Sequence, residues 1–398
     1  MADGKKKDEA TRLVSSGRPK ERPSHPVTHP PERASTILFP TYEDFTATER
    51  EFFYGRFGTR THRAFEASIG ELEAAEHVYL APSGLAAVTL SLLAFAQPGS
   101  HILVTDSAYD PVRGYCDRFL KRMQVETEYY DPHIGSDIAG LIRENTAAIL
   151  AESPGSLTFE IQDIPALGSA AKQAGVPLLV DNTWSAGVYF KPLDHGATVS
   201  IQAATKYIGG HSDCLLGTIA MNDPSAERKV ANCLRQIGSN VSADDVWLAH
   251  RGLRTLAARL PVHQSNGIAL ARWLEARDDV VCVLHPALES HPDHELWKRD
   301  FTGATGLFGF ELPPCSDKQL TAFCNALEHF GMGYSWGGFE SLCIPVPVHK
   351  YRTVSPRPEP GPERGPLMRI HAGLESADDL IMDLEQAFAA FDAAGKQG

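Results

Sequence analysis

The sequence predicts an α/β fold with a mostly parallel sheet, followed by a smaller α+β region. Between residues 61 and 256, short apolar runs alternate with segments of helical periodicity, as in proteins built on a parallel sheet. After residue 257, the predicted helices and strands follow one another less regularly. Hydrophobic residues make up 43% of the 398 residues, which is enough for a large core. We therefore expect a large domain at 61–256 and a small domain at 257–398.

Hydrophobic periodicity gives the individual elements in chain order. In the first region it predicts helices at residues 65–76, 86–95 and 164–174. Short apolar runs there predict strands at residues 101–105, 147–152, 177–180, 198–203 and 218–221. In the second region the same patterns predict helices at 262–277, 316–327 and 377–394, and strands at 280–285, 306–312 and 367–371. A proline-rich loop is expected from Pro345 to Pro366, and the polar residues 1–34 are expected to form a mobile arm or one ordered only against a partner subunit.

Charge and composition argue against several classes of protein. The net charge of −13 speaks against a nucleic-acid surface, which needs clustered lysine and arginine. No apolar run approaches the length of a membrane-spanning helix, and residues 1–14 lack the apolar stretch of a signal peptide. The seven scattered cysteines are typical of a reduced, cytoplasmic protein. Three nearby histidines do not have a metal-ligand spacing, so no metal is expected: His285, His291 and His294.

Lys206 is the most informative residue, because it lies among small and apolar neighbours in the run from Ser200 to His211. A lysine in such surroundings can lose its proton and act as a nucleophile towards an aldehyde. The alternative is a solvated lysine at a strand end, which is where most lysines lie. The adjacent Thr205 hydroxyl is a candidate phosphate ligand, unless it bonds only to nearby backbone.

Asp181 ends the apolar run at 177–180, where a carboxylate costs free energy unless it is paired. One alternative is a local cap formed with Asn182 and Thr183. The other is pairing with the protonated ring nitrogen of a cofactor. A strand-end aspartate upstream of a reactive lysine is the layout expected of a pyridoxal-phosphate (PLP) enzyme.

Two further segments contain groups suited to a phosphate and an aromatic ring. Ser83, Gly84 and Leu85 precede the predicted helix at 86–95, whose free backbone N–H groups can bind a phosphate. An ordinary capped helix would have the same sequence. Tyr109 follows a predicted strand and can stack on a ring, although a packing role is the common alternative.

Two arginines are candidates for binding anions. Arg56 and Tyr54 flank a glycine and can both bind phosphate oxygens, unless they belong to an ordinary surface loop. Arg369 lies inside the apolar strand at 367–371, where a guanidinium needs an anionic partner. That partner is either the α-carboxylate of an amino-acid substrate or a structural carboxylate.

These motifs occur together and in a fixed order, and residues 35–394 resemble the PLP-dependent trans-sulfuration family. The resemblance rests on residues 54–56, 83–85, 152–156, 181–184, 200–213, 285–288, 335–342 and 369–375. It implies the aspartate-aminotransferase-like fold, called fold type I. Residues 200–207, 210–213, 297–303 and 335–342 are similar to the β-lyase members, and His371 stands where much of the family has serine.

The resemblance also implies a role for each candidate residue. Lys206 would carry PLP as a Schiff base and act as general base, Asp181 would pair with the ring nitrogen, and Tyr109 would stack over the ring. Arg369 would bind the substrate carboxylate. The phosphate would be held by Ser83, Gly84, Leu85, Ala203 and Thr205, and the substrate would also lie near Ser335, Trp336 and Tyr54. Tyr54 and Arg56, on an arm at 1–60, would reach the phosphate of a neighbouring subunit, which implies a homodimer or a tetramer built as a dimer of dimers.

The implied activity is carbon–sulfur β-cleavage of L-cystathionine to L-homocysteine, pyruvate and ammonia, as part of methionine biosynthesis in the cytoplasm. Three alternatives stay open: a broader cysteine-S-conjugate β-lyase, a sibling γ-lyase or γ-synthase, and a PLP protein with a mainly regulatory binding role. Phe57 stands where some bacterial β-lyases carry a second arginine, which leaves the range of substrates open.

Overall fold

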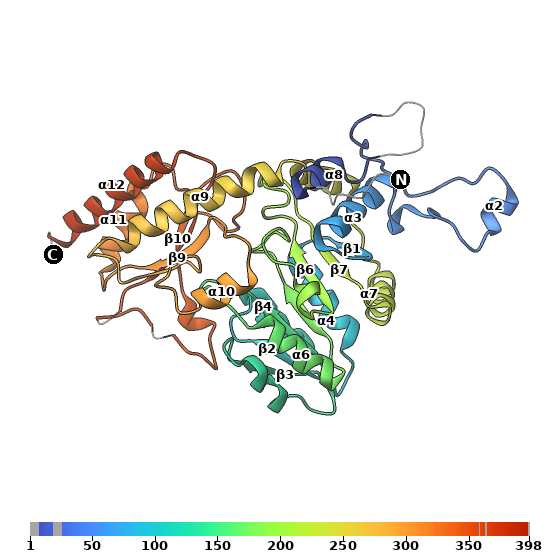
Figure 1. The fold of residues 1–398 in the computed structure, drawn as a ribbon, viewed down its shortest axis with the longest axis horizontal. Helices are drawn as coiled ribbons and strands as arrows, with labels where there is room; N and C mark the ends of the chain where they lie inside the picture. The colour runs from blue at the N-terminus through green and yellow to red at the C-terminus, as the bar shows by residue number, and fades with distance from the viewer. Residues whose placement is uncertain (1–7, 19–25, 358, 363, 397–398) are drawn as a thin grey trace.

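The computed structural model describes residues 8–18, 26–357, 359–362 and 364–396, and it contains two sheets with helices packed around them (Figure 1). The first sheet has seven strands in the order β1-β7-β6-β5-β4-β2-β3. Their bounds are β1 His77–Ala81, β2 His101–Thr105, β3 Glu126–Tyr130, β4 Thr146–Glu152, β5 Leu178–Asp181, β6 Val199–Ala203 and β7 Gly217–Met221. The neighbours β3, β2, β4, β5 and β6 pair in parallel, and only β7 runs the other way. The predicted α/β fold with a mostly parallel sheet is confirmed.

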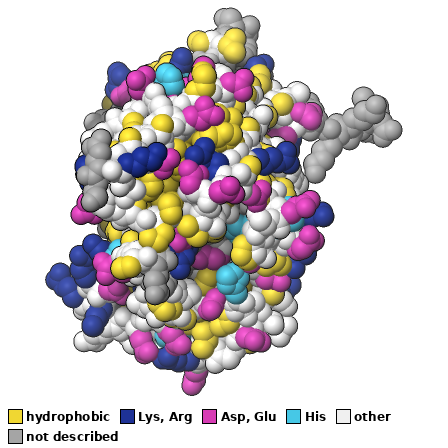
Figure 2. All heavy atoms as spheres, turned by 90° about the vertical axis from the view of Figure 1, so that its left-hand side faces the viewer, with side chains coloured by type: hydrophobic (Ala, Val, Ile, Leu, Met, Phe, Trp, Pro, Cys, Tyr) yellow, Lys and Arg dark blue, Asp and Glu magenta, His cyan; other side chains and the backbone are white. Residues whose placement is uncertain are grey.

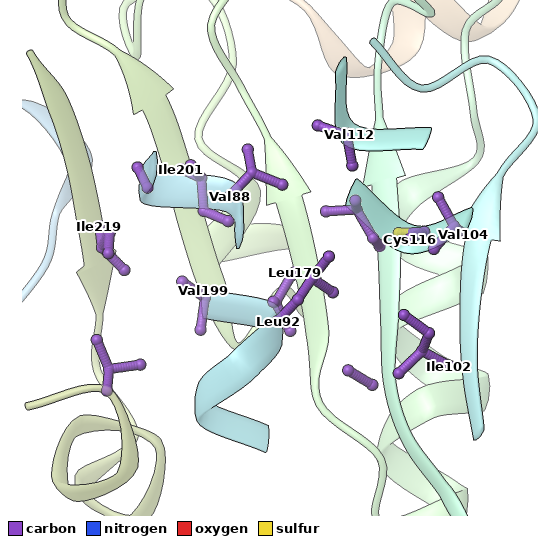
Figure 3. Packing of buried hydrophobic residues seen from close by; sticks show 14 of the residues in the cluster. Val88, Leu92, Ile102, Val104, Val112, Cys116, Leu179, Val199, Ile201 and Ile219 are labelled. Carbon is purple, nitrogen blue, oxygen red and sulfur yellow. The ribbon is translucent and has the colours of Figure 1, made fainter. Parts of the chain in front are cut away.

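Both faces of this sheet are buried, which explains why its strands have continuous apolar sequences. On one face, Val88 and Leu92 of α4 (Gly84–Phe95) pack against Leu179, Val199 and Ile201 of β5 and β6 (Figure 3). The opposite face carries the alternate residues of the same strands, such as Leu178 and Val180, and packs against α6 (Ile164–Ala174). The sheet is therefore a rigid base for whatever lies at its edges.

The second sheet is antiparallel, with four strands in the order β10-β11-β9-β8. Its strands are β8 Cys282–Leu284, β9 Leu307–Glu311, β10 Leu342–Val346 and β11 Leu367–His371. Three helices cover it: α9 Leu256–Glu275, α11 Asp317–Ala326 and α12 Ala377–Gly395. Figure 1 shows α9 running from the first sheet to the second. The expected domain limits at 61–256 and 257–398 stay a prediction.

Several elements differ from the sequence-based expectation. The helix expected at 65–76 is α3, Arg60–Glu73, which begins earlier because Thr59 and His62 form a capping box. The helix expected at 262–277 is α9, which continues through Pro261. β10 extends into the expected proline-rich loop, and Pro345 is tolerated there because β10 is an edge strand. The strands β1 and β3, and the helices α7 (Pro224–Ile237) and α8 (Ala243–Leu253), were not predicted.

The N-terminal part differs from a wholly mobile or partner-dependent arm. Residues Glu9–Ser15 form α1, which packs on the same chain with Leu13 buried and Glu9 paired with Lys191 at 3.0 Å. The segment around α2, Tyr42–Thr46, instead extends away from the rest of the molecule (Figure 1). It exposes several apolar side chains, including Leu38 at 88% and Tyr42 at 74%.

On the face in Figure 2, basic and acidic side chains are intermingled. Among the described residues, no helix is both long and apolar enough to cross a membrane.

Candidate active site

The carboxyl edge of the first sheet brings together candidate residues that lie far apart in the sequence. Lys206 follows β6, Asp181 ends β5, and Tyr109 follows β2. Since β1 is antiparallel to β7, and β7 to β6, β1 runs in the same direction as β6 and delivers Ser83 to this edge too. Ligands of parallel sheets bind at this edge, so the topology itself assembles the candidate site.

Lys206 lies in the turn after β6, and its side chain contacts the loop that precedes β10. Its Nζ donates a hydrogen bond to Ser335 Oγ at 2.6 Å, and it lies 5.1 Å from the centre of the Trp336 ring. Burial lowers the pKa of Lys206 to about 8, with the positive charge of Arg369 acting in the same direction and Asp181 opposing it. The amine therefore loses its proton more readily than an ordinary lysine, as a nucleophile or base must.

Asp181 is partly satisfied by local bonds. Thr183 donates to its Oδ1 twice, from the backbone nitrogen at 3.0 Å and from Oγ1 at 2.6 Å. Among the described residues, no hydrogen bond reaches Oδ2. Burial raises the pKa of Asp181, while the bonds from Thr183 and the charge of Lys206 oppose that rise. The local cap considered from the sequence is thus present on one oxygen, and the other is free to accept from a cationic N–H.

Glu152 is a neighbouring carboxyl group that was not among the candidate residues. It ends β4 in direct register with Asp181, and its Oε2 accepts a hydrogen bond from Tyr109 N at 2.7 Å. Burial raises the pKa of Glu152 well above its ordinary value, and the charge of Asp181 raises it further. The signal in the sequence was its place at the end of an apolar strand, the same signal that pointed to Asp181.

The N-terminus of α4 has the features of a phosphate-binding turn. Ser83 caps the helix by accepting a hydrogen bond from Ala86 N at 3.1 Å, so the simple cap is present as well. A Cβ added to Gly84 would lie 2.3 Å from the Cβ of Ala203, which means that only glycine allows the helix to approach β6 this closely. Thr205 exchanges hydrogen bonds with the backbone of Leu216, at 3.0 and 3.3 Å.

Arg369 lies on β11 of the second sheet and is 6% exposed. Its Nη2 donates to Gly333 O at 3.0 Å, and its buried Nε has no hydrogen-bond partner. No carboxylate pairs with it among the described residues, so the structural ion pair considered from the sequence is absent there. The guanidinium is instead available to an anion beside Lys206.

Tyr109 is 49% exposed, and the loop that carries it is fixed by Asp106. Asp106 is fully buried and pairs with Arg113 at 2.8 Å. It also accepts hydrogen bonds from the backbone nitrogens of Thr353, Val354 and Ser355. Those three residues follow β10, so Asp106 ties the loop of Tyr109 to the second half of the chain.

Tyr54 and Arg56 do not join the cluster around Lys206 within one chain. Arg56 donates to Arg235 O at 3.2 Å, and its guanidinium lies 4.2 Å from the centre of the Phe57 ring. Arg56 and Phe57 line a cavity between the arm, α3, β1 and α7, whereas none of the residues around Lys206 does. Tyr54 is 44% exposed, and the described residues offer it no hydrogen bond or ring contact with the cluster.

The residues at this edge fit PLP. The free Asp181 Oδ2 suits a pyridinium N–H, the Lys206 amine suits an aldehyde, and the capped N-terminus of α4 suits a phosphate. The unpartnered Nε of Arg369 suits the carboxylate of an amino acid. Each of these groups can make a further bond to one part of the cofactor or substrate.

Comparison with known proteins decides the family. Residues 10–389 match the family described as Cys/Met metabolism PLP-dependent enzymes. The chain belongs to this family. Its cofactor is therefore PLP, as the resemblance implied.

Individual members of the Cys/Met metabolism family are similar over nearly the whole chain. The cystathionine β-lyase of Haemophilus influenzae is 42% identical, covering 96% of this chain and 98% of the relative. The cystathionine β-lyase of Escherichia coli is also 42% identical, covering 98% and 99%. Among solved structures, the cystathionine γ-synthase of Xanthomonas oryzae pv. oryzae, in complex with aminoacrylate and cysteine, has a TM-score of 0.89 and 31% identity, covering 98% of this chain and 100% of the other. The resemblance to PLP-dependent enzymes of fold type I is thus confirmed.

Proposed function

We propose that this protein is a PLP-dependent carbon–sulfur β-lyase that cleaves L-cystathionine to L-homocysteine, pyruvate and ammonia. The observation that carries the proposal is the Lys206 amine, which is hydrogen-bonded to Ser335 Oγ and has a pKa lowered by burial and by the charge of Arg369. The relatives named cystathionine β-lyase, at 42% identity, support β-cleavage more strongly than the γ-synthase structure at 31% supports γ-chemistry.

In this proposal Lys206 moves the proton. Its neutral amine removes the proton from Cα of the substrate as general base and then protonates the departing sulfur. When bound, PLP supplies an electron sink for the negative charge left at Cα. The three-carbon fragment leaves as an enamine, which water converts to pyruvate and ammonia.

Other residues of the chain hold and orient the reactants. Arg369 binds the substrate α-carboxylate through its planar fork, and Ser335 holds the Lys206 amine beside Cα. Tyr109 would stack on the cofactor ring, and Asp181 would keep the ring nitrogen protonated. The phosphate is held by Ser83, Gly84, Leu85, Ala203 and Thr205.

We further propose that the active unit is a dimer within a tetramer, located in the cytoplasm. Tyr54 and Arg56 of one subunit reach the phosphate bound by its neighbour, and Tyr54 also approaches the substrate. Two observations support this: both residues lie apart from the Lys206 cluster of their own chain, and the segment around α2 exposes apolar side chains such as Leu38 and Tyr42.

Phe57 stands where a second arginine could bind the distal amino-acid half of the substrate. Its ring stacks on Phe53 with centroids 4.4 Å apart and lies under the guanidinium of Arg56. An apolar ring offers no ionic contact to the distal amino-acid half of cystathionine. We therefore propose that other cysteine S-conjugates are accepted as secondary substrates.

Steady-state kinetics on three amino acids test the proposed activity. Cystathionine and cystine carry sulfur on Cβ, whereas methionine carries it on Cγ, so a β-lyase cleaves the first two and leaves methionine intact. We expect cystathionine to give the highest kcat/KM, cystine a lower value, and methionine no keto acid. Turnover of methionine at a rate comparable to that of cystathionine would indicate a γ-lyase instead.

A further inference from the structure

The loop from Ser335 to Gly338 wraps around Lys206. Ser335 Oγ accepts a hydrogen bond from the Lys206 amine, and the Trp336 ring lies next to the same nitrogen. Gly337 packs against the lysine backbone, because a Cβ built on it would lie 2.8 Å from Tyr207 N and 3.0 Å from the Lys206 carbonyl carbon. The loop thus contacts both the backbone and the reactive end of Lys206.

The conformation of this loop is not one that its sequence favours. Ser335 has a φ of 73°, in the left-handed region that disfavours residues with a side chain. Such a conformation persists only where surrounding contacts hold it. Something beyond Ser335 must therefore keep its hydroxyl on the Lys206 amine.

His371 provides contacts that hold the loop. The side chain is fully buried on β11, and its Nε2 accepts a hydrogen bond from Gly337 N at 3.1 Å. The Gly338 carbonyl oxygen lies 3.2 Å from the same nitrogen. Because the Gly337 N–H can only donate, its hydrogen bond requires the lone pair of Nε2. In that tautomer the ring proton is on Nδ1, which is buried and has no hydrogen-bond partner among the described residues, and the Gly338 oxygen is a neighbour of Nε2 rather than an acceptor from it.

The surroundings of His371 keep it neutral. Burial lowers the pKa of His371 well below its ordinary value, and the neighbouring His263 lowers it further. The Gly338 carbonyl opposes this effect, while the charges of Arg369 and Lys206 add to it. The Tyr207 and His263 rings pack around it, with centroids 5.7 and 5.2 Å away. Together these surroundings favour the neutral ring, and therefore a lone pair at Nε2 that can accept from Gly337 N.

We propose that His371 is a positioning residue for Lys206, acting through the backbone of Gly337 to hold the Ser335 hydroxyl on the lysine amine. The proposal rests on the proposed role of Lys206 as the reactive amine. It does not depend on which carbon–sulfur bond of the substrate breaks. His371 is fully buried behind the loop, so in this proposal its effect on the reaction passes through Ser335.

A double-mutant cycle with a spectroscopic readout tests this proposal. The variants are His371→Leu, which removes the acceptor, Ser335→Ala, and the two combined. Ser335 Oγ accepts a hydrogen bond from the Lys206 nitrogen and so favours the protonated state of that nitrogen. The absorbance of the PLP-bound enzyme changes with pH, and the midpoint of this titration should fall when the hydrogen bond is lost. We expect each single variant to lower that midpoint by about one unit and kcat by about tenfold. In the double variant, the midpoint and kcat should fall no further than in either single variant.

Conservative variants separate positioning from stability. His371→Gln places an amide oxygen where Nε2 lies and should restore the midpoint and most of kcat. His371→Asn is too short to reach Gly337 N and serves as the second test if the leucine variant does not fold. Additive losses in the double variant, or a wild-type midpoint in His371→Leu or His371→Asn despite a lower Tm, would overturn the proposal. A γ-cleavage product would overturn the proposed function alone.

Discussion

Replacing Lys206 with alanine is expected to abolish both turnover and the yellow colour of the bound cofactor. In the proposed mechanism this amine bonds with the cofactor aldehyde, and it is also the general base. Loss of a general base alone costs up to about 10⁴-fold in rate, so we expect kcat to fall by at least that factor. The measurement is the visible absorption spectrum of the purified variant together with its pyruvate production.

Two control variants locate the effect at this amine. Lys206→Arg keeps a positive charge but cannot lose its proton, so it should be as inactive as the alanine variant. Lys172 is an exposed lysine on α6, and Lys172→Ala should keep wild-type colour and rate. A yellow, active Lys206→Ala protein would show that another residue carries the cofactor.

Asp181→Asn is expected to give the second largest loss. Asparagine keeps the size of the side chain and an oxygen for the Thr183 hydrogen bonds, but it removes the negative charge beside the ring nitrogen. Without that charge the ring nitrogen loses its proton and the electron sink weakens. We expect kcat/KM to fall by about 10²–10³-fold, the usual cost of removing one preorganised electrostatic contact. The Kd for PLP, measured by titrating the cofactor-free variant, should also rise.

Glu152 offers a matched control for Asp181. It ends the adjacent strand at the same level, yet burial and the charge of Asp181 raise its pKa well above the ordinary value and so favour its neutral form. Glu152→Gln therefore changes little in charge, and its effect on kcat/KM should stay within about threefold. If Glu152→Gln were as damaging as Asp181→Asn, the ring-nitrogen role of Asp181 would have to be reassigned.

The positions of Asp181 and Lys206 at one sheet edge were predictable because they depend on short local patterns. An apolar strand that ends in a carboxylate, and a lysine among small residues, are visible in the sequence as Asp181 and Lys206. The parallel sheet then follows from alternating strands and helices, and it is this sheet that brings the two residues together. The family resemblance added Ser335 and Trp336, which no local pattern would have indicated.

What the sequence does not reveal depends on contacts between distant segments. β1 and β3 lie at the two edges of the first sheet, and β3 carries the half-polar run Glu126–Tyr130, so hydrophobic periodicity did not reveal it. Leu13 makes α1 part of the main body, although the residues around it look like a polar tail. The hydrogen bond between His371 and Gly337 joins a strand to a loop more than 30 residues away in the chain. These contacts arise only once both sheets have formed.

The identity of the products from L-cystathionine tests the central claim most directly. The substrate carries its sulfur on Cβ of one half and on Cγ of the other, so the two fragments report which bond was broken. Separating and identifying both products by mass spectrometry after a short incubation with the PLP-bound enzyme should give pyruvate and homocysteine, with no 2-oxobutyrate. Cysteine together with 2-oxobutyrate would contradict the assignment of β-cleavage.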